Sequence, residues 1–424
     1  MVLLYLLISA MPLVRNPLWE HFMSDLTTIK YLGLACLAYA LWHCALARRL
    51  PPLGRSCQAL AMTALCGWAA VSWFTQGAAI AWKDSPLLSY LSFLLLLVIV
   101  LGVVDTWARL EHVLWAIVIA VAIASLYVVR EWQEYHLLYV NFRPGWVTGD
   151  PNYFTASALV GLPLALALAG RSQRLWKRLI ALGCGLLSLA AVGLAASRGG
   201  LLGLLAMGGW WAWHKRRFTV LVVLLVLAGP PLLFWSRSPL NRLMHPSASD
   251  IKSSDTRLAL WQAGMHMVED HPLAGIGLGE FKAEVELYAA GHKNLDHIAH
   301  NSYLALAAEM GLPALAAYLF VIGAAVVTLG RWRRESLQAL EWATPAETPP
   351  WAADAALGMQ AAVVGFSVAA FFLSAQYTKL LWLLLAIIAA VGILRSAQTA
   401  EAPEAPALAA EPVSIPCLEE QIHA

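Results

Sequence analysis

Four side chains that could bind or react with a substrate lie close to apolar segments in the sequence. Arg143 and Arg198 each precede an apolar stretch, Arg257 lies in the longest polar segment, and His300 precedes another apolar stretch. Guanidinium groups bind phosphate through paired hydrogen bonds, and a neutral imidazole accepts a proton from a hydroxyl group. If they meet at a membrane boundary, they suit a reaction in which a hydroxyl group displaces a lipid-anchored diphosphate from a sugar.

Each of these residues also has a simpler explanation. Arg198 can extend to the membrane interface or pair with a carboxylate, and Arg257 can be an ordinary solvated arginine. His300 can be a surface histidine without a role. A metal site is a further alternative, for which the nearby candidates are His292, Asp296, His297 and His300. We expect no metal and no cofactor, because arginines can stabilise the charge of a leaving diphosphate by themselves.

The composition indicates a membrane protein. Of the 424 residues, 60% are hydrophobic and 13% are charged, whereas soluble domains carry about 25% charged residues. The apolar residues form blocks of roughly 17–22, long enough to cross about 30 Å of hydrocarbon as helices. A net charge of +2 excludes the strongly basic surface of a nucleic-acid-binding protein. Six cysteines are present, but none lies in the longest polar loop, so a disulfide framework is not expected.

The predicted fold is all-α and polytopic, with about twelve transmembrane helices. These helices cover residues 1–14, 28–47, 57–76, 86–104, 111–129, 153–170, 176–196, 199–213, 218–235, 300–329, 356–375 and 379–394. The first is interpreted as a span rather than a cleaved signal, since Met1 to Pro12 contains no basic residue. The polar interruption before residue 379 is predicted to be a tight turn.

The distribution of basic residues predicts the orientation of these spans. With the N-terminus inside, 15 of the 28 Lys and Arg residues fall in cytoplasmic connections, whereas the short outside connections and their flanks hold 7. Both termini are therefore expected in the cytoplasm. The predicted organisation is nine helices in 1–235, a long periplasmic loop in 236–299, three helices in 300–395 and a disordered cytoplasmic tail in 396–424.

The long loop is predicted to contain an amphipathic helix that carries Arg257. Ser253 or Ser254 would cap it, and Asp270-His271-Pro272 would end it. Such a helix would lie on or dip into the outer leaflet. No strand precedes the GIGLG run that follows, so these glycines are expected to form a turn rather than a nucleotide-binding loop.

The outside connection NFRPGWVTGDPNYF leads into the sixth span. Asp150 followed by proline is a helix-start signal, so capping is the stronger explanation of this carboxylate. Arg143, Trp146 and Tyr153 would lie on the same side of the membrane as the other candidates. We include Arg143 as a candidate ligand of the diphosphate on this topological ground alone.

Several motifs together resemble the O-antigen ligase family of bacterial membrane glycosyltransferases. They are TGDPNYF, the SRGG that opens a span, DTRLALWQAGMHMVEDHPLAGIGLGEF, and HNSYLALAAEMGLPALAAYL after a loop of suitable length. The resemblance covers about residues 145–325, and the predicted twelve-span layout agrees with it. Each motif alone is weak; their order and their placement in the predicted topology make the match fairly specific.

The resemblance implies a C-type glycosyltransferase that moves O-antigen polysaccharide from undecaprenyl diphosphate to lipid A–core oligosaccharide at the periplasmic face of the inner membrane. It places the essential arginines at Arg198 and Arg257, which would hold the donor diphosphate, and the essential histidine at His300. This histidine would assist the acceptor hydroxyl group. Direct displacement would invert the anomeric configuration.

Three alternatives stay open. O-antigen polymerases and protein O-oligosaccharyltransferases use the same kind of donor, and no acceptor signature is apparent in the first third of the chain. A carboxylate-dependent mechanism would use Glu20 or Asp25 in the first outside loop. A transporter or flippase for the same lipid-linked glycan is the non-enzymatic alternative, although its charges would be expected at mid-membrane rather than at one face.

Overall fold

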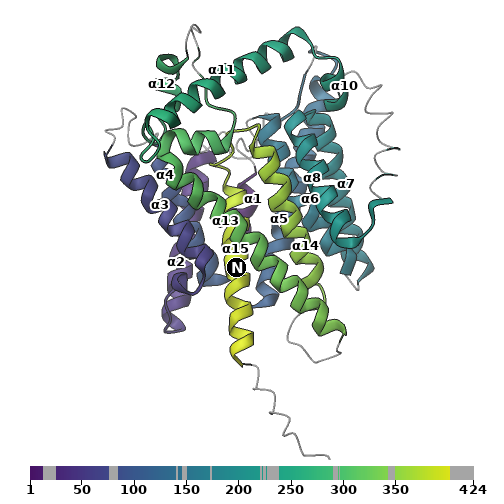
Figure 1. The fold of residues 1–424 in the computed structure, drawn as a ribbon. Helices are drawn as coiled ribbons and strands as arrows, with labels where there is room; N and C mark the ends of the chain where they lie inside the picture. Colours follow the sequence, from purple (N-terminus) through teal and green to yellow (C-terminus); the bar gives the residue numbers. More distant parts are fainter. Residues whose placement is uncertain are drawn as a thin grey trace, which may run out of the picture.

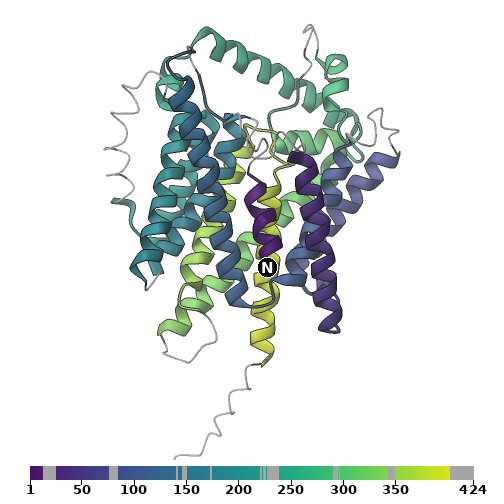
Figure 2. The ribbon, with the colours of Figure 1, turned by 180° about the vertical axis from the view of Figure 1, so that it is seen from behind.

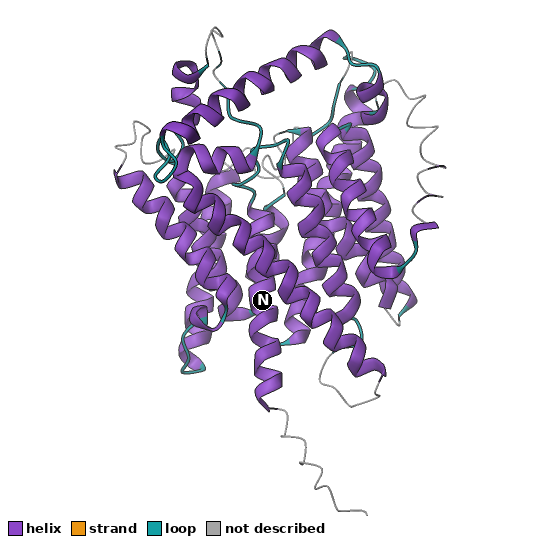
Figure 3. Ribbon diagram, viewed as in Figure 1, coloured by secondary structure: helices purple, strands orange, loops and turns teal. Residues whose placement is uncertain are grey.

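The structure is a computed structural model that describes residues 1–12, 25–75, 85–139, 142–145, 150–171, 174–219, 222, 226, 238–289, 295, 297–341 and 349–401. In these ranges the chain forms helices and connecting loops, without a strand (Figure 3). The prediction of an all-α membrane protein is therefore confirmed.

Most of the helices run roughly antiparallel to their neighbours in one bundle (Figures 1 and 2). In chain order they are α1 (Val2–Ala10), α2 (Asp25–Leu46), the short 3₁₀ turn η1 (Leu53–Arg55), α3 (Cys57–Thr75), α4 (Pro86–Val103), α5 (Trp107–Tyr135), α6 (Pro151–Arg171), α7 (Leu175–Ala195), α8 (Arg198–Lys215), α10 (Pro239–Met244), α11 (Ala248–Asp270), α12 (Phe281–Tyr288), α13 (Ser302–Glu341), α14 (Ala352–Ala370) and α15 (Lys379–Glu401).

Nine helices of the described chain are long and apolar enough to cross a membrane, namely α2 to α7 and α13 to α15. Helix α8 coincides with the eighth predicted span. Helix α1 has nine residues, which is about 14 Å at a rise of about 1.5 Å per residue, and is shorter than the predicted span 1–14. The predicted span 218–235 lies almost wholly outside the described residues, so the number twelve stays a prediction.

The centre of the bundle is formed by α15, whose residues from Leu380 to Val391 are all buried (Figure 1). A helix that is apolar around its whole circumference is suited to the interior of a protein or to a membrane, and α15 occupies the interior. Close packing of α8 against α14 depends on glycine: a Cβ atom on Gly203 of α8 would lie 2.6 Å from the carbonyl oxygen of Gly365 in α14.

Residues 371–378 separate α14 from α15, so the two helices do not form one continuous segment.

Helices α10, α11 and α12 lie together at one end of the bundle, and the chain leaves α15 at the opposite end (Figures 1 and 2). The apolar side of α11, with Leu260, Ala263 and Met267, packs against Phe281 and Val285 of α12 and against α13. Protein covers Leu260 of the apolar face that the sequence predicts to meet the outer leaflet, whereas Leu258 and Met265 of the same face are 58% and 52% exposed. Contact of these two residues with the leaflet stays a prediction.

Helix α13 is interrupted near the end of the bundle where α10, α11 and α12 lie. Gly311 has φ 79° and ψ 172°, which interrupts α13 between Ser302, where it begins, and its long C-terminal part. Ile276 and Gly277 donate backbone hydrogen bonds to the carbonyl oxygens of Ala308 and Glu309, at 2.8 and 3.0 Å. The predicted GIGLG turn is confirmed, since Gly275, Gly277 and Gly279 all have positive φ. The turn therefore pairs with the carbonyl groups that precede the break.

Substitution of Gly311 by alanine is expected to destabilise the protein strongly. The new Cβ atom would lie 2.2 Å from the carbonyl oxygen of Leu273, at a backbone conformation that L-residues rarely adopt, and such strain costs about 1–3 kcal/mol. Thermal unfolding of the purified protein in detergent measures the effect. Gly323→Ala is the matched control, because a Cβ atom at that position of the same helix meets nothing within 4 Å. Equal unfolding temperatures for the two variants would contradict the requirement for glycine.

Candidate functional site

The hairpin between α7 and α8 forms the floor of the site. Ala196 ends α7 in the left-handed conformation, with φ 50°, and Ser197 caps α8 by accepting a hydrogen bond from the backbone N–H of Gly200 at 3.2 Å. Arg198 is thus the first residue of α8, as the sequence predicted. A Cβ atom on Gly200 would lie 2.1 Å from Thr155 Cγ2, so glycine lets the hairpin sit against α6. The first N–H groups of α8 and its dipole favour an anion at this point.

Two arginines are held by the carbonyl end of α7. Arg143 Nε donates to the carbonyl oxygen of Ala195 at 3.0 Å, and Arg242 Nη1 donates to that of Ala196 at 3.0 Å. The carbonyl end of a helix carries partial negative charge, which favours cations beside it. Asn152 joins the arrangement, because its Oδ1 atom accepts hydrogen bonds from Arg143 Nη2 at 3.0 Å and from Ser197 Oγ at 2.8 Å.

Helix α11 carries Arg257 over the site, but it begins earlier than the sequence predicted. Ser247, not Ser253 or Ser254, is the N-cap, and it forms a capping box with Asp250. Ser254 instead donates to the backbone oxygen of Asp250 at 2.9 Å inside the helix. The capping-box signature S-x-x-[DE] is present at 247–250. The predicted end at Asp270 is confirmed.

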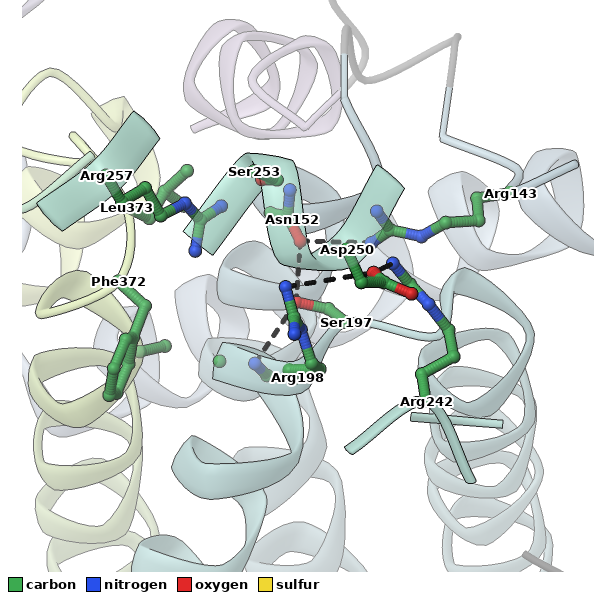
Figure 4. A pocket seen from close by; sticks show the side chains of 13 residues that line it. Arg143, Asn152, Ser197, Arg198, Arg242, Asp250, Ser253, Arg257, Phe372 and Leu373 are labelled. Carbon is green, nitrogen blue, oxygen red and sulfur yellow. Dashed lines mark hydrogen bonds and ion pairs between the residues drawn. The ribbon is translucent and has the colours of Figure 1, made fainter. Parts of the chain in front are cut away.

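These elements enclose a cavity of about 120 Å³, lined by four arginines, Arg143, Arg198, Arg242 and Arg257. Figure 4 shows Arg143, Arg198 and Arg242 gathered around the carboxylate of Asp250, with Arg257 entering from the opposite side. Phe372 and Leu373, in the connection between α14 and α15, add an apolar wall. The cavity is therefore mainly polar and positively charged, with a smaller apolar surface on one side.

The electrostatics of the cavity favour an anion. Burial lowers the pKa of Arg143 to about 10, and the neighbouring charge of Arg242 contributes to the shift. Burial also lowers the pKa of Arg257, with a further contribution from Arg198. These guanidinium groups stay charged at neutral pH and repel one another, so a bound anion would relieve the repulsion.

His300 lies beside this cavity but does not line it. Burial lowers the pKa of its imidazole, and the charge of Arg257 lowers it further. The hydrogen bond from Trp261 of α11 to the carbonyl oxygen of Ala299 holds the segment beside the helix that carries Arg257. His300 Nδ1 is buried and makes no hydrogen bond in the described part of the chain. A largely neutral imidazole of this kind suits proton acceptance near neutral pH.

The backbone at His300 is held by contacts from three sides. His300 has a left-handed backbone conformation, with φ 50°. Trp261, one helical turn after Arg257 on α11, donates its indole N–H to the carbonyl oxygen of Ala299 at 3.0 Å. Asn301 caps α13 by accepting from the backbone N–H of Tyr303 at 3.0 Å, and Ser302 Oγ donates to the carbonyl oxygen of Leu373 at 2.6 Å.

The structure brings three of the predicted residues, Arg143, Arg198 and Arg257, to one cavity and places His300 beside it. Asp150 caps α6, as predicted, by accepting from the backbone N–H of Asn152 at 2.7 Å. Tyr153 does not line the cavity, and its hydroxyl group donates to the carbonyl oxygen of Ser374 at 2.9 Å. Trp146, His292, Asp296 and Glu20 lie outside the described residues, and of Asp25 only the helical backbone is described.

Sequence reasoning missed Arg242, Asp250, Asn152 and Ser197. No short motif marks Arg242, which belongs to the six-residue helix α10.

The described residues contain no group of three or more His, Cys, Asp or Glu side chains arranged to hold a metal ion. The arginines are thus the principal charged groups of the site.

Residues 183–319 match a family model described as O-antigen ligase. This segment contains Arg198, Arg242, Asp250, Arg257 and His300, whereas Arg143 lies outside it. The resemblance inferred from the motifs is confirmed, and the chain contains an O-antigen ligase domain. Proteins with this domain are glycosyltransferase-like enzymes, and they include ligases, polymerases and oligosaccharyltransferases. A comparison with curated proteins finds no significant match.

His300 is expected to titrate below its usual pKa of 6.5. Since the positive charge of Arg257 disfavours the imidazolium form, Arg257→Gln should raise the pKa of His300 towards the usual value. Histidine side-chain NMR as a function of pH measures both values, with His300→Gln used to assign the resonance. Arg331→Gln, in the part of α13 far from His300, is the control and should leave the pKa unchanged. An unshifted pKa in Arg257→Gln would contradict the electrostatic coupling.

Proposed function

We propose, from the O-antigen ligase domain and the arginine-lined cavity, that this protein transfers a glycan from a polyprenyl diphosphate to an acceptor hydroxyl group. In its specific form, the donor is undecaprenyl diphosphate-linked O-antigen and the acceptor is lipid A–core oligosaccharide. The observation that carries the proposal is the convergence of four arginines on the N-terminus of α8, beside His300. Such a constellation binds a diphosphate through charge-assisted hydrogen bonds.

The position of the cavity supports a donor that remains in the membrane. The cavity lies where α8, α11 and the connection between α14 and α15 meet, at one end of the membrane-spanning bundle. Phe372 and Leu373 offer apolar contacts beside the arginines. A diphosphate on a lipid chain would contact the arginines through its phosphates and the apolar wall through its lipid. A soluble phosphate compound would contact the arginines alone. We assign this end of the bundle to the periplasmic face of the bacterial inner membrane, with both termini in the cytoplasm.

The proposed reaction is a direct displacement. The acceptor hydroxyl oxygen attacks the anomeric carbon of the sugar, and its proton passes to the imidazole of His300. The bond between the anomeric carbon and the diphosphate oxygen breaks, and the electron pair remains on that oxygen. Arg198 and Arg257 stabilise the developing charge, with Arg143 and Arg242 beside them. Attack opposite to the leaving group inverts the anomeric configuration.

Loss of the central arginines or of His300 is expected to abolish transfer from the lipid-linked donor. Removal of one such charge-stabilising group typically costs about 10²–10³ in rate, and removal of a general base about 10²–10⁴. Arg198→Ala, Arg257→Ala and His300→Ala are assayed in reconstituted membranes after their insertion has been verified. Arg331→Ala, at the exposed far part of α13, is the matched control and should remain active.

Transfer is also expected to survive EDTA, because the arginines supply the charge that a metal would otherwise provide. The same reconstituted assay tests this point directly. Activity that disappears with chelator and returns with added divalent metal would contradict the proposal. A mechanism that uses Glu20 or Asp25 would then be favoured.

The acceptor is the part of the proposal for which the domain offers alternatives, namely an O-antigen polymerase or a protein O-oligosaccharyltransferase. Purified protein supplied with donor, with and without lipid A–core, separates these activities. Glycan attached to the core is the expected product. Longer carrier-linked chains formed without the core would identify a polymerase, and transfer only to an added protein acceptor would identify an oligosaccharyltransferase.

A transporter of the same lipid-linked glycan is disfavoured by the placement of the charges. The four arginines of the cavity gather at one end of the bundle rather than at its middle, whereas transporters place substrate sites near the bilayer midplane. Movement of lipid-linked glycan across liposomes, without joining it to an acceptor, would reverse this assignment.

A further inference from the structure

One carboxylate stands among the arginines of the cavity. Asp250 is the single acidic side chain among the described residues that line it. Its Oδ1 atom forms an ion pair with Arg242 and lies 3.8 Å from Arg198 Nη2. The side chain is 5% exposed, so water screens these interactions weakly.

The two oxygens of Asp250 have separate partners. Oδ2 accepts hydrogen bonds from the Ser247 hydroxyl at 2.8 Å and from the Ser247 backbone N–H at 3.3 Å, which completes the capping box of α11. Oδ1 faces the cavity and meets the arginines. Helix capping therefore explains the position of Oδ2 only. The ion pairs of Oδ1 with the arginines have no part in the cap.

Asp250 is anionic throughout the physiological range. Burial alone would raise the pKa of this carboxyl group, but the hydrogen bonds from Arg242 and Ser247 hold it at about 2. A carboxylate oxygen paired with guanidinium groups resembles a phosphate oxygen in charge and in hydrogen-bond geometry. The Oδ1 atom thus neutralises part of the charge to which a diphosphate would bind.

We propose that Asp250 is a built-in competitor of the donor diphosphate, which occupies one anion position of the empty cavity and limits how tightly a diphosphate binds there. The proposal rests on the proposed function. It adds a residue that sets the affinity for the donor diphosphate and the release of the product diphosphate. When the diphosphate enters, Arg198 and Arg242 exchange contacts with Asp250 for contacts with phosphate oxygens.

The chemistry of transfer gives this competition a use. The donor diphosphate is esterified at both ends, whereas cleavage at the sugar exposes a terminal phosphate whose second ionisation lies near a pH of about 6. The product is therefore more negative than the donor at neutral pH. Four arginines without a counter-charge would hold it more tightly than the donor and would slow turnover. A fixed carboxylate repels the additional charge and favours exchange of product for new donor.

Asp250→Asn tests the proposal, because asparagine keeps an acceptor for the cap but loses the charge. Binding of inorganic diphosphate to the purified full-length protein is measured by calorimetry, and the variant is expected to bind about tenfold more tightly than the parent. Ser247→Ala is the matched control, since it weakens the capping box and leaves the Oδ1 ion pairs in place; its affinity should equal that of the parent. If the asparagine variant does not fold, Asp250→Ser gives the same comparison.

A second readout uses the reaction itself. Asp250→Asn should lower the steady-state rate relative to the rate of its own first turnover, and its inhibition by added undecaprenyl diphosphate should increase.

Equal or weaker diphosphate binding by Asp250→Asn would overturn the proposal and indicate that Asp250 only orients the arginines. Absence of diphosphate binding in the parent as well would instead overturn the proposed function. The two failures are therefore distinguishable.

Discussion

Repulsion among guanidinium groups is the constraint on which this end of the molecule depends. Arg143 and Arg242 are held by the terminal carbonyl oxygens of α7, Arg198 begins α8, and Asp250 offsets part of their charge. The carbonyl oxygens and the carboxylate place partial or full negative charge beside these cations in a poorly hydrated space, whereas the N-terminus of α8 adds partial positive charge. The negative charge of these groups balances the arginines only in part, and the remaining positive charge is the physical basis of the proposed diphosphate binding.

Helix α11 connects the anion site to the proposed base. It carries Asp250, then Arg257 about two turns later and Trp261 about one turn after that, and Trp261 donates to the carbonyl group that precedes His300. The apolar side of α11 is anchored on α12 and on the start of α13, where the turn around Gly275 pairs with the break at Gly311. A displacement of α11 would therefore alter the arginines and the setting of His300 together.

Local sequence signals predicted those features that depend on neighbouring residues. Apolar blocks predicted the spanning helices, and Ser-Arg-Gly-Gly predicted the start of α8 at Arg198. Asp150-Pro151 predicted the cap of α6. The cap of α11 was misplaced because a serine near Arg257 was preferred to Ser247, whose S-x-x-[DE] spacing is the better signal. The amphipathic pattern of α11 does not specify what covers its apolar face, of which protein covers Leu260 and leaves Leu258 and Met265 exposed.

The sequence by itself determined the membrane-embedded, all-helical class and the candidate roles of Arg198, Arg257 and His300, since hydropathy and motif order are properties of short segments. Only the tertiary structure decided that Arg143 and Arg242 belong to the same cavity, that Asp250 stands among them, and that His300 lies beside the cavity rather than in its wall. These relations join residues from the α5–α6 connection, α8, α10, α11 and the start of α13. They depend on how helices pack, which no local pattern of residues encodes.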